Sequence, residues 1–262
     1  MDVHWKAITG ALLVSNRPAE EHVGMSIRRF LVSDLTGDRI QVTGGEAAHA
    51  LKVLRLSKGD PVILFDGRGA EAEGTIGAVD REAFEVEVSM RRAKSPRMTR
   101  ELTIAAAIPK GERADWMIEK CAELGVARLV PLVCERSQVK PGEAKLERWR
   151  RKAAEAAKQS RQASMMDIKA LQPLGEYIAS VAADSGLLFG DGNASQSMQE
   201  AIADRSAGTN WVICIGPEGG FTEEERKTLC ARGAQPVSLG PTILRVETAV
   251  VAAAAVWACS HP

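Results

Sequence analysis

The clearest evidence for the fold class is the segment Ile213-Cys-Ile-Gly-Pro-Glu-Gly-Gly-Phe-Thr-Glu-Glu-Glu225. Its first residues end an apolar run over 211–215, which is typical of a buried strand. A helix is expected over 222–231, because Thr222 followed three residues later by Glu225 forms a capping box. A strand that turns directly into a helix is the unit of a parallel α/β sheet, and such sheets bind ligands at the carboxyl ends of their strands.

The turn contains more special residues than a connection needs. Gly216, Gly219 and Gly220 accompany Pro217 and Glu218, and glycine allows positive φ and close approach of the backbone to a ligand. No Lys-Ser/Thr follows, as a Walker loop would require, and the spacing does not match GxGxxG. The acidic start of the next helix would repel phosphate. We therefore expect a ligand site that is not built for phosphate.

A second turn of the same kind occurs in Leu239-Gly-Pro-Thr-Ile-Leu-Arg-Val-Glu-Thr-Ala249. A strand is expected over 236–239 and an apolar, alanine-rich helix over 246–259. Arg245 stands at the junction, close to Glu247, where the two form either a surface pair of little energetic value or part of a site. Two such turns at strand ends favour a shared cleft.

The rest of the chain divides into a β-rich part and an α/β part. Over 101–262, strands and helices alternate, with strands expected at 102–108, 128–133 and 186–189 and helices at 115–124 and 146–162. Over 25–92, a small barrel is expected from strands at 29–32, 39–42, 61–65, 72–79 and 83–88, with a helix at 46–54. Residues 1–24 are an extension expected to be poorly ordered, and 93–100 form a polar, basic linker.

Composition excludes several classes of protein. Lys+Arg and Asp+Glu are each 34, so no overall basic coat exists, and 4% aromatic residues disfavour base-stacking platforms. The five scattered cysteines form no CxxC, so we expect no zinc site or disulfide framework, only buried thiols in a reducing compartment. No apolar run is long enough for a membrane span, and the short stretch over 7–14 has no cleavage site after it. We expect a cytoplasmic protein.

Charge is nevertheless uneven along the chain. From Arg136 to Lys169 ten Lys/Arg face four Asp/Glu, a net charge of +6, whereas from Ala170 to the end five face ten, a net charge of −5. The basic block coincides with the helix expected at 146–162. It is either a solvated helix face or a surface that contacts phosphates.

The two turns, IGPEGGFT and LG-x-x-ILR-x-ETA, closely resemble the RsmE family of 16S ribosomal RNA uridine-N3 methyltransferases, in the SPOUT class. Further matching pieces are Arg28-Arg-Phe, His49-Ala-Leu-Lys-Val-Leu-Arg with Gly59-Asp60, Lys110-Gly-x-Arg and Glu119-Lys-Cys-x-Glu-Leu-Gly-Val. The resemblance extends from about Ser26 to about Ala258. One stretch departs from it: where the family commonly has Q-[SC]-G-R, this chain has Gln159-Ser-Arg-Gln.

This resemblance implies a PUA-like N-terminal β-barrel and a C-terminal α/β domain tied in a trefoil knot, which topology rules alone would reject. It also implies S-adenosylmethionine as methyl donor, no metal, and a homodimer. The expected donor-binding residues are Leu188, Phe189, Gly190, Ile215, Gly216, Pro217, Gly219, Gly220, Leu239, Gly240, Ile243, Leu244 and Thr248.

The implied reaction sets three demands on the site. The donor methyl group must lie in line with N3, the N3 proton must leave, and the negative charge spreading over the ring oxygens must be stabilised. We assign Arg245 to stabilising the developing uridine anion or aligning the RNA, and Glu218 to orienting the donor or relaying the proton. His49 belongs to the barrel and is expected to contact RNA or to be structural.

Partners follow from the basic residues and from the last helix. The expected contacts to 16S rRNA or the small ribosomal subunit are Arg28, Arg29, His49, Arg55, Arg148, Arg151 and Arg161. The helix at 246–259 is apolar nearly all round, which favours burial against a second subunit. Alternatives are a SPOUT methyltransferase acting on tRNA and an RNA-binding protein without catalysis. A nucleotide-dependent oxidoreductase lacks a matching fingerprint.

Overall fold

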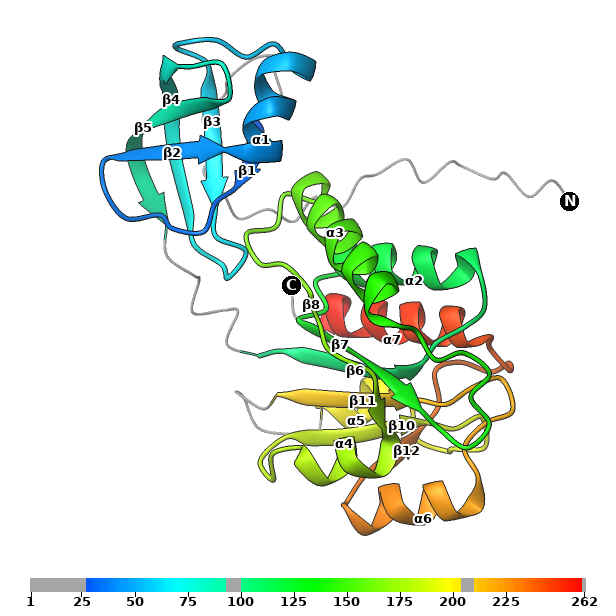
Figure 1. Ribbon diagram of the computed structural model, residues 1–262. Coiled ribbons are helices and arrows are strands. Elements are labelled where there is room, and N and C mark those ends of the chain that lie inside the picture. The colour runs from blue at the N-terminus through cyan, green and yellow to red at the C-terminus, as the bar shows by residue number, and fades with distance from the viewer. Residues whose placement is uncertain (1–26, 93–99, 204–209, 261–262) are drawn as a thin grey trace, which may run out of the picture.

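A computed structural model describes residues 27–92, 100–203 and 210–260. The N-terminal extension, predicted to be poorly ordered, and nearly all of the predicted linker lie outside these ranges. Two separate sheets organise the chain, a small one at the N-terminal end and a larger one that forms the rest of the molecule (Figure 1).

The first sheet is curled and has the strand order β1-β3-β4-β5-β2. β1 and β3 are parallel, and the other pairs are antiparallel. Alternating side chains fill its interior, where the rings of Phe30 and Phe84 meet edge to face at 5.4 Å. Its strands are β1 Arg28–Leu31, β2 Arg39–Thr43, β3 Pro61–Phe65, β4 Glu71–Val79 and β5 Ala83–Arg92.

A short helix crosses one side of this sheet. α1 spans Gly44–Ala48 and continues as a π-helical turn, His49–Val53. The wider turn is visible in the bond from the Leu54 N–H to the His49 carbonyl, at 3.0 Å. The helix predicted over 46–54 is thus present over 44–53, with its second half π-helical.

The second sheet is parallel throughout, in the order β12-β10-β11-β6-β7-β8, with β9 also pairing β7. All six residues of β6 are buried, which explains why its sequence is apolar apart from Thr103. The strands are β6 Leu102–Ala107, β7 Arg128–Val133, β8 Asp167–Ile168, β9 Gln172–Pro173, β10 Gly186–Gly190, β11 Trp211–Ile215 and β12 Gln235–Val237.

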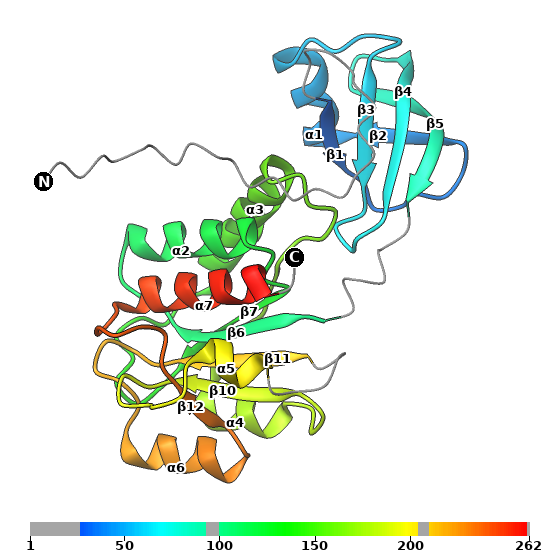
Figure 2. The same ribbon diagram turned by 180° about the vertical axis from the view of Figure 1, so that it is seen from behind.

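Helices cover both faces of the parallel sheet (Figures 1 and 2). One hydrophobic cluster unites one face with α2 Glu112–Glu123, α3 Glu143–Gln159, α5 Met198–Ala203 and α7 Val246–Ser260. A second cluster packs the opposite face against α4 Leu174–Ser180 and α6 Glu223–Ala231. α7 lies against the two central strands β6 and β11 and against α2.

Local signals placed some helix ends well and others poorly. The predicted capping box is present at α6, where Thr222 accepts the Glu225 N–H and the Glu225 carboxylate accepts the Thr222 N–H. α3 runs from Glu143 to Gln159 instead of over 146–162. It ends early because Arg161 has a φ of 58°, and the N–H groups of Arg161 and Gln162 bond back to Lys158 and Ala157 in a Schellman motif. α2 begins at Glu112 and not at residue 115.

The segment after α3 joins the two sheets by main-chain hydrogen bonds. The Met165 N–H donates to the Gly67 carbonyl at 2.8 Å, and the Gly69 N–H donates to the Ala163 carbonyl at 3.2 Å. The Arg29 guanidinium adds a bond to the Gln162 carbonyl. The small sheet is thereby held at the edge of the parallel sheet where its strands begin (Figures 1 and 2).

The five cysteines are free thiols. Cys121, Cys134 and Cys214 are buried, and burial raises the pKa of Cys121 and of Cys134 to about 12. Cys230 and Cys259 are exposed, so the expectation that all five are buried was wrong. Within the described ranges, no helix is long and apolar enough to cross a membrane, and no three metal-ligating side chains cluster.

Candidate functional site

A cavity of about 360 Å³ opens at the carboxyl ends of β10, β11 and β12. The segments that follow these three strands form its walls, as expected for a parallel sheet. Its lining includes both predicted turns. The predicted residues that line it are Gly190, Ile215, Gly216, Pro217, Glu218, Gly220, Leu239, Gly240, Ile243 and Leu244.

Four residues predicted to bind the donor do not line this cavity. Leu188 and Phe189 are buried in the hydrophobic clusters on opposite faces of the sheet. Thr248 is exposed on α7. Gly219 lies against Arg136, whose guanidinium donates to the Gly219 carbonyl at 2.6 Å. Gly219 therefore shapes the turn from outside, whereas Gly220, with a φ of 71°, forms part of the wall.

The turn after β11 is tied to the loop that follows β7. Besides the Arg136 contact, the Glu225 carboxylate accepts the Glu135 N–H at 2.8 Å. The same carboxylate accepts the Thr222 N–H in the capping box. One side chain thus fixes the helix start and the neighbouring loop together, which holds the glycine-rich turn in one conformation.

Two charged residues of the cavity wall were missed by the sequence analysis. Asp191 follows β10, and Arg226 lies in the first turns of α6. Their side chains form an ion pair at 2.5 Å, and the Arg226 guanidinium also lies over the Phe189 ring at 5.6 Å. The Arg226 hydrogen bond holds the pKa of Asp191 below its usual range, although desolvation opposes this shift. No sequence motif joins the two, because only the fold brings them together.

The two predicted catalytic residues are both exposed at this edge. Glu218 belongs to the cavity lining, and Arg245 lies between the lining residues Leu244 and Val246. Among the described residues, Arg245 has no ion pair. Glu247, considered above as its partner, instead faces Arg113 across 3.6 Å. Arg245 is thus available to an anionic ligand.

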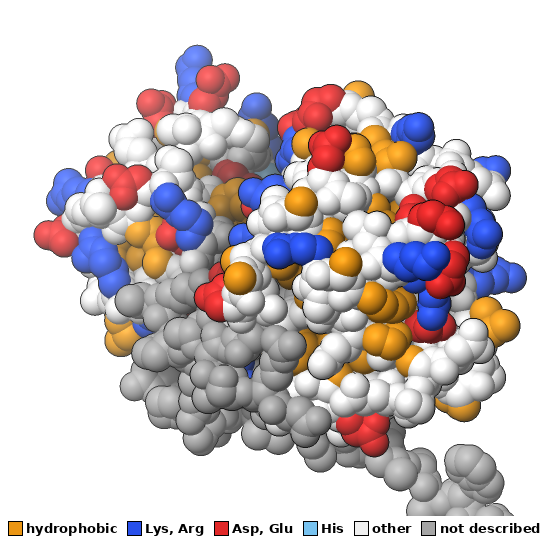
Figure 3. All heavy atoms as spheres, turned by 90° about the horizontal axis from the view of Figure 1, so that it is seen from below, with side chains coloured by type: hydrophobic (Ala, Val, Ile, Leu, Met, Phe, Trp, Pro, Cys, Tyr) orange, Lys and Arg blue, Asp and Glu red, His pale blue; other side chains and the backbone are white. Residues whose placement is uncertain are grey.

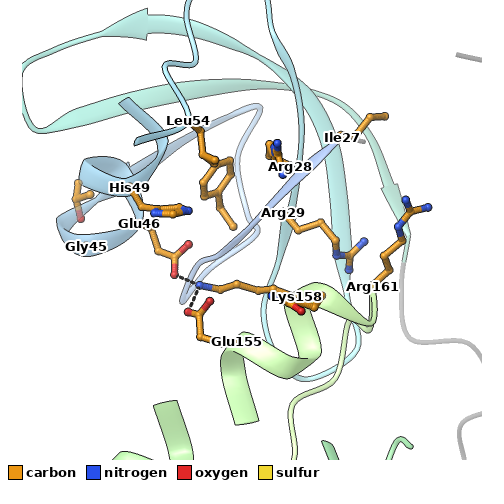
Figure 4. A pocket seen from close by; sticks show the side chains of 13 residues that line it. Ile27, Arg28, Arg29, Gly45, Glu46, His49, Leu54, Glu155, Lys158 and Arg161 are labelled. Atoms are coloured by element: carbon orange, nitrogen blue, oxygen red, sulfur yellow. Dashed lines mark hydrogen bonds and ion pairs between the residues drawn. The ribbon is translucent and has the colours of Figure 1, made fainter. Parts of the chain in front are cut away.

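Four of the seven predicted RNA-contacting residues line a cavity at the opposite edge. Arg28, Arg29, His49 and Arg161 line a cavity of about 750 Å³ between the small sheet and the end of α3 (Figure 4). In its floor, Lys158 pairs with Glu46 of α1 and with Glu155. Burial lowers the pKa of Lys158, but the contacts with these two carboxylates outweigh burial and raise it.

Not all of these basic groups face solvent. The Arg29 side chain is only 5% exposed, pairs with Glu71 and lies over the Phe65 ring at 5.3 Å. Arg148 is exposed but bonds to Asp115. Of the six predicted arginines, four are exposed and form no ion pair with another described residue: Arg28, Arg55, Arg151 and Arg161.

A neighbouring cavity of about 710 Å³ lies between residues 67–71 of the small sheet and the first residues of the parallel strands. It brings together arginines that are far apart in the sequence, of which only Arg161 was predicted as a site residue. They are Arg68, Arg92, Arg100, Arg128 and Arg161. The face that carries α4 and α6 has no such concentration of arginines in its described part, where basic, acidic and hydrophobic side chains are interspersed (Figure 3).

Comparison with known proteins defines the class first. The model of an RNA methyltransferase domain matches residues 96–258, and that of an RNA methyltransferase PUA domain matches residues 42–89. Together they cover the parallel sheet and most of β3 to β5 of the small sheet, whereas β1 precedes both matches.

Individual relatives then narrow the class. Ribosomal RNA small subunit methyltransferase E from Synechocystis sp. is 32% identical, over 82% of this chain and 71% of its own length. A probable rRNA-methyltransferase from Porphyromonas gingivalis is 32% identical, with a TM-score of 0.78 over 90% of this chain and 98% of its own. The Neisseria gonorrhoeae methyltransferase E, solved bound to S-adenosyl methionine, is 26% identical, with a TM-score of 0.78 over 88% and 96%. The chain belongs to the ribosomal RNA small subunit methyltransferase E family.

Proposed function

We propose that this protein transfers a methyl group from S-adenosylmethionine to N3 of a specific uridine in 16S ribosomal RNA. The observation that carries the proposal is the cavity at the carboxyl edge, walled by two glycine-containing turns in a chain of this family. A Cβ atom on Gly220 or Gly240 would project into open space, so main-chain atoms are accessible there. These walls fit a nucleoside held by backbone groups and apolar side chains.

The residues of this edge meet the demands of the reaction in different ways. The turns around Gly216 and Gly240 would hold the methyl donor, which supplies an electrophilic methyl group when bound. Arg245 would stabilise the negative charge that develops on the uridine ring. Glu218, exposed at the rim, would orient the donor or accept the N3 proton.

The finer architecture is part of the same proposal. We infer that residues 25–92 form a PUA-like RNA-binding barrel and residues 101–262 a SPOUT domain with a trefoil knot, joined by a linker at 93–100. The curl of the first sheet and its PUA match support the barrel. For the knot, the support is that residues of the 239–244 segment line one cavity with the loops after β10 and β11, before the chain enters α7.

RNA contacts are assigned to the opposite edge. The seam is the region between the small sheet and the end of α3, where Arg28, His49 and Arg161 line one cavity. The exposed residues that would contact phosphates are Arg28, Arg55, Arg151 and Arg161, together with His49. A substrate in 16S rRNA or the small subunit would place the activity in the cytoplasm.

A homodimer completes the proposal. Trp116 on α2 is 45% exposed and Ile243, beside the cavity, is 97% exposed, although both are large and apolar. α7, which packs against α2, leaves several of its alanines and valines only partly buried. A second copy would cover these groups. Sedimentation at micromolar concentration tests this, and a clean 28.1 kDa species would remove the dimer.

The decisive experiment is mass mapping of ribosomal RNA from a strain that lacks this gene. We expect one N3-methyluridine of 16S rRNA to disappear and to return when the purified protein and S-adenosylmethionine are supplied. Assembled subunits, free 16S rRNA and tRNA should be compared as substrates. Methylation of tRNA alone would show that the protein is a tRNA methyltransferase. RNA binding without methyl transfer would show that it is an RNA-binding protein without catalysis.

A further inference from the structure

The wall of the donor cavity contains one carboxylate that the proposed mechanism does not use. Asp191 lines the cavity, yet its side chain is only 7% exposed. Its main chain is fixed on both sides, since its N–H donates to the Val237 carbonyl at 3.0 Å and its carbonyl accepts the Ala194 N–H at 3.1 Å. The carboxylate is therefore held in place before any ligand binds.

The carboxylate has acceptor capacity to spare. One oxygen accepts the Asn193 N–H at 3.0 Å, and the other accepts from the Arg226 guanidinium at 2.5 Å. An ionised carboxylate has about four acceptor positions, so two remain for a ligand. Because Asp191 stays ionised beside Arg226, it accepts hydrogen bonds and donates none.

The net charge of the Asp191–Arg226 pair indicates whether a charged or a neutral ligand group binds there. Arg226 neutralises Asp191, so the site has almost no net charge and gives little advantage to an ammonium group. A neutral group that donates two hydrogen bonds suits it better. In α/β folds, acidic residues near strand ends accept hydrogen bonds from ribose hydroxyls in this way.

We propose that Asp191, held by Arg226, binds the ribose hydroxyls of the methyl donor and so makes the cavity selective for ribonucleosides. This inference rests on the proposed function, because it assigns a part of the same donor. The Arg226 guanidinium, fixed over Phe189, acts as the positioning group for the carboxylate.

The test uses 5′-methylthioadenosine, which has the ribose diol but no amino acid part, and its 2′,3′-dideoxy analogue. Calorimetry with the full-length protein should show that the diol compound binds about tenfold or more tightly than the dideoxy compound. In Asp191→Asn, affinity for the diol compound should fall by about the same factor, and the two compounds should bind alike. If Asp191 served the ammonium group of the donor, this variant would bind 5′-methylthioadenosine normally.

Asp184→Asn is the matched control, because Asp184 is exposed just before β10 whereas Asp191 follows that strand. It should discriminate like the unmodified protein. If Asp191→Asn does not fold, Arg226→Gln provides a second variant, in which the carboxylate loses its positioning group, so discrimination between the two compounds should fall.

Equal binding of the two compounds to the unmodified protein would overturn the inference, as would unchanged discrimination in Asp191→Asn or in Arg226→Gln. Failure of the unmodified protein to bind S-adenosylmethionine would instead overturn the proposed function.

Discussion

At the carboxyl edge of the parallel sheet, the cavity is walled mainly by glycines, apolar side chains and main chain, whereas arginines and carboxylates wall the two cavities at the amino edge. The first kind of wall suits a small nucleoside, and the second suits a polyanion. Five-residue strands such as β11 separate the two edges by about 17 Å. Within one chain, donor binding and RNA binding should therefore be separable by mutation.

The separation also bears on where the target base lies. RNA held at the seam of one chain must extend along the sheet to reach the donor of that chain, or reach the donor of a second copy.

Gly220→Val should have the largest effect, with loss of donor affinity on the order of a hundredfold or more, because a branched side chain would fill the cavity wall. RNA affinity should not change. The matched control is Gly233→Val, since Gly233 has a similar φ of 77°, compared with 71°, but lies at the end of α6 outside the cavity lining. Calorimetry with S-adenosylmethionine distinguishes the two, and equal losses would mean that strain and not the cavity is responsible.

Arg245→Ala should lower the rate of methyl transfer on the order of a hundredfold with little change in donor affinity. The reason is that the anion it would stabilise forms only in the transition state. Single-turnover methylation at saturating donor and RNA measures this effect. Arg245→Lys should recover part of the rate, and a near-normal rate for the alanine variant would remove Arg245 from the mechanism.

Arg151→Ala should reduce the slope of log affinity for RNA against log salt concentration by about one, because one phosphate contact is lost. Donor affinity should stay the same. Arg81→Ala, in the exposed turn between β4 and β5, is the control and should leave the slope unchanged. An unchanged slope for Arg151→Ala as well would show that this side of α3 is only solvated.

Arg161→Gly should have the smallest effect and the opposite sign on stability. A left-handed backbone costs a non-glycine residue about 1–2 kcal/mol, part of which the flexibility of glycine in the unfolded chain cancels, so a gain of up to about 1 kcal/mol is expected. Arg151→Gly, inside α3, should instead lose about 1 kcal/mol. Urea unfolding measures both, and a loss in Arg161→Gly would mean that its side chain stabilises the seam.

Sequence alone located what depends on near neighbours. The strand Trp211–Ile215 and the capping box at Thr222 were predicted correctly because an apolar run and a three-residue spacing determine them. The two-residue strands β8 and β9 and the short helices α4 and α5 were not predicted, because segments of this length leave little periodicity to detect.

The site residues, too, were predicted where the signal is local and missed where residues distant in the sequence meet. The glycine turns were found from their composition, but the Asp191–Arg226 pair joins residues 35 positions apart and was missed. Arg29 and Glu71 are 42 positions apart, so the burial of Arg29 was equally invisible in the sequence. The departure at Gln159-Ser-Arg-Gln has a structural counterpart, because Arg161 occupies the left-handed position where the family pattern has glycine.

The main-chain bonds between Gly67, Gly69, Ala163 and Met165 also set an order of events during synthesis. The small sheet is complete once Arg92 has left the ribosome, but the strand-like segment it docks against is made much later. At about 5–20 residues per second, the finished N-terminal part waits several seconds for its binding partner in the same chain. During that interval the Gly67 carbonyl and the Gly69 N–H have not yet met Met165 and Ala163, so the docking edge of the small sheet is still open.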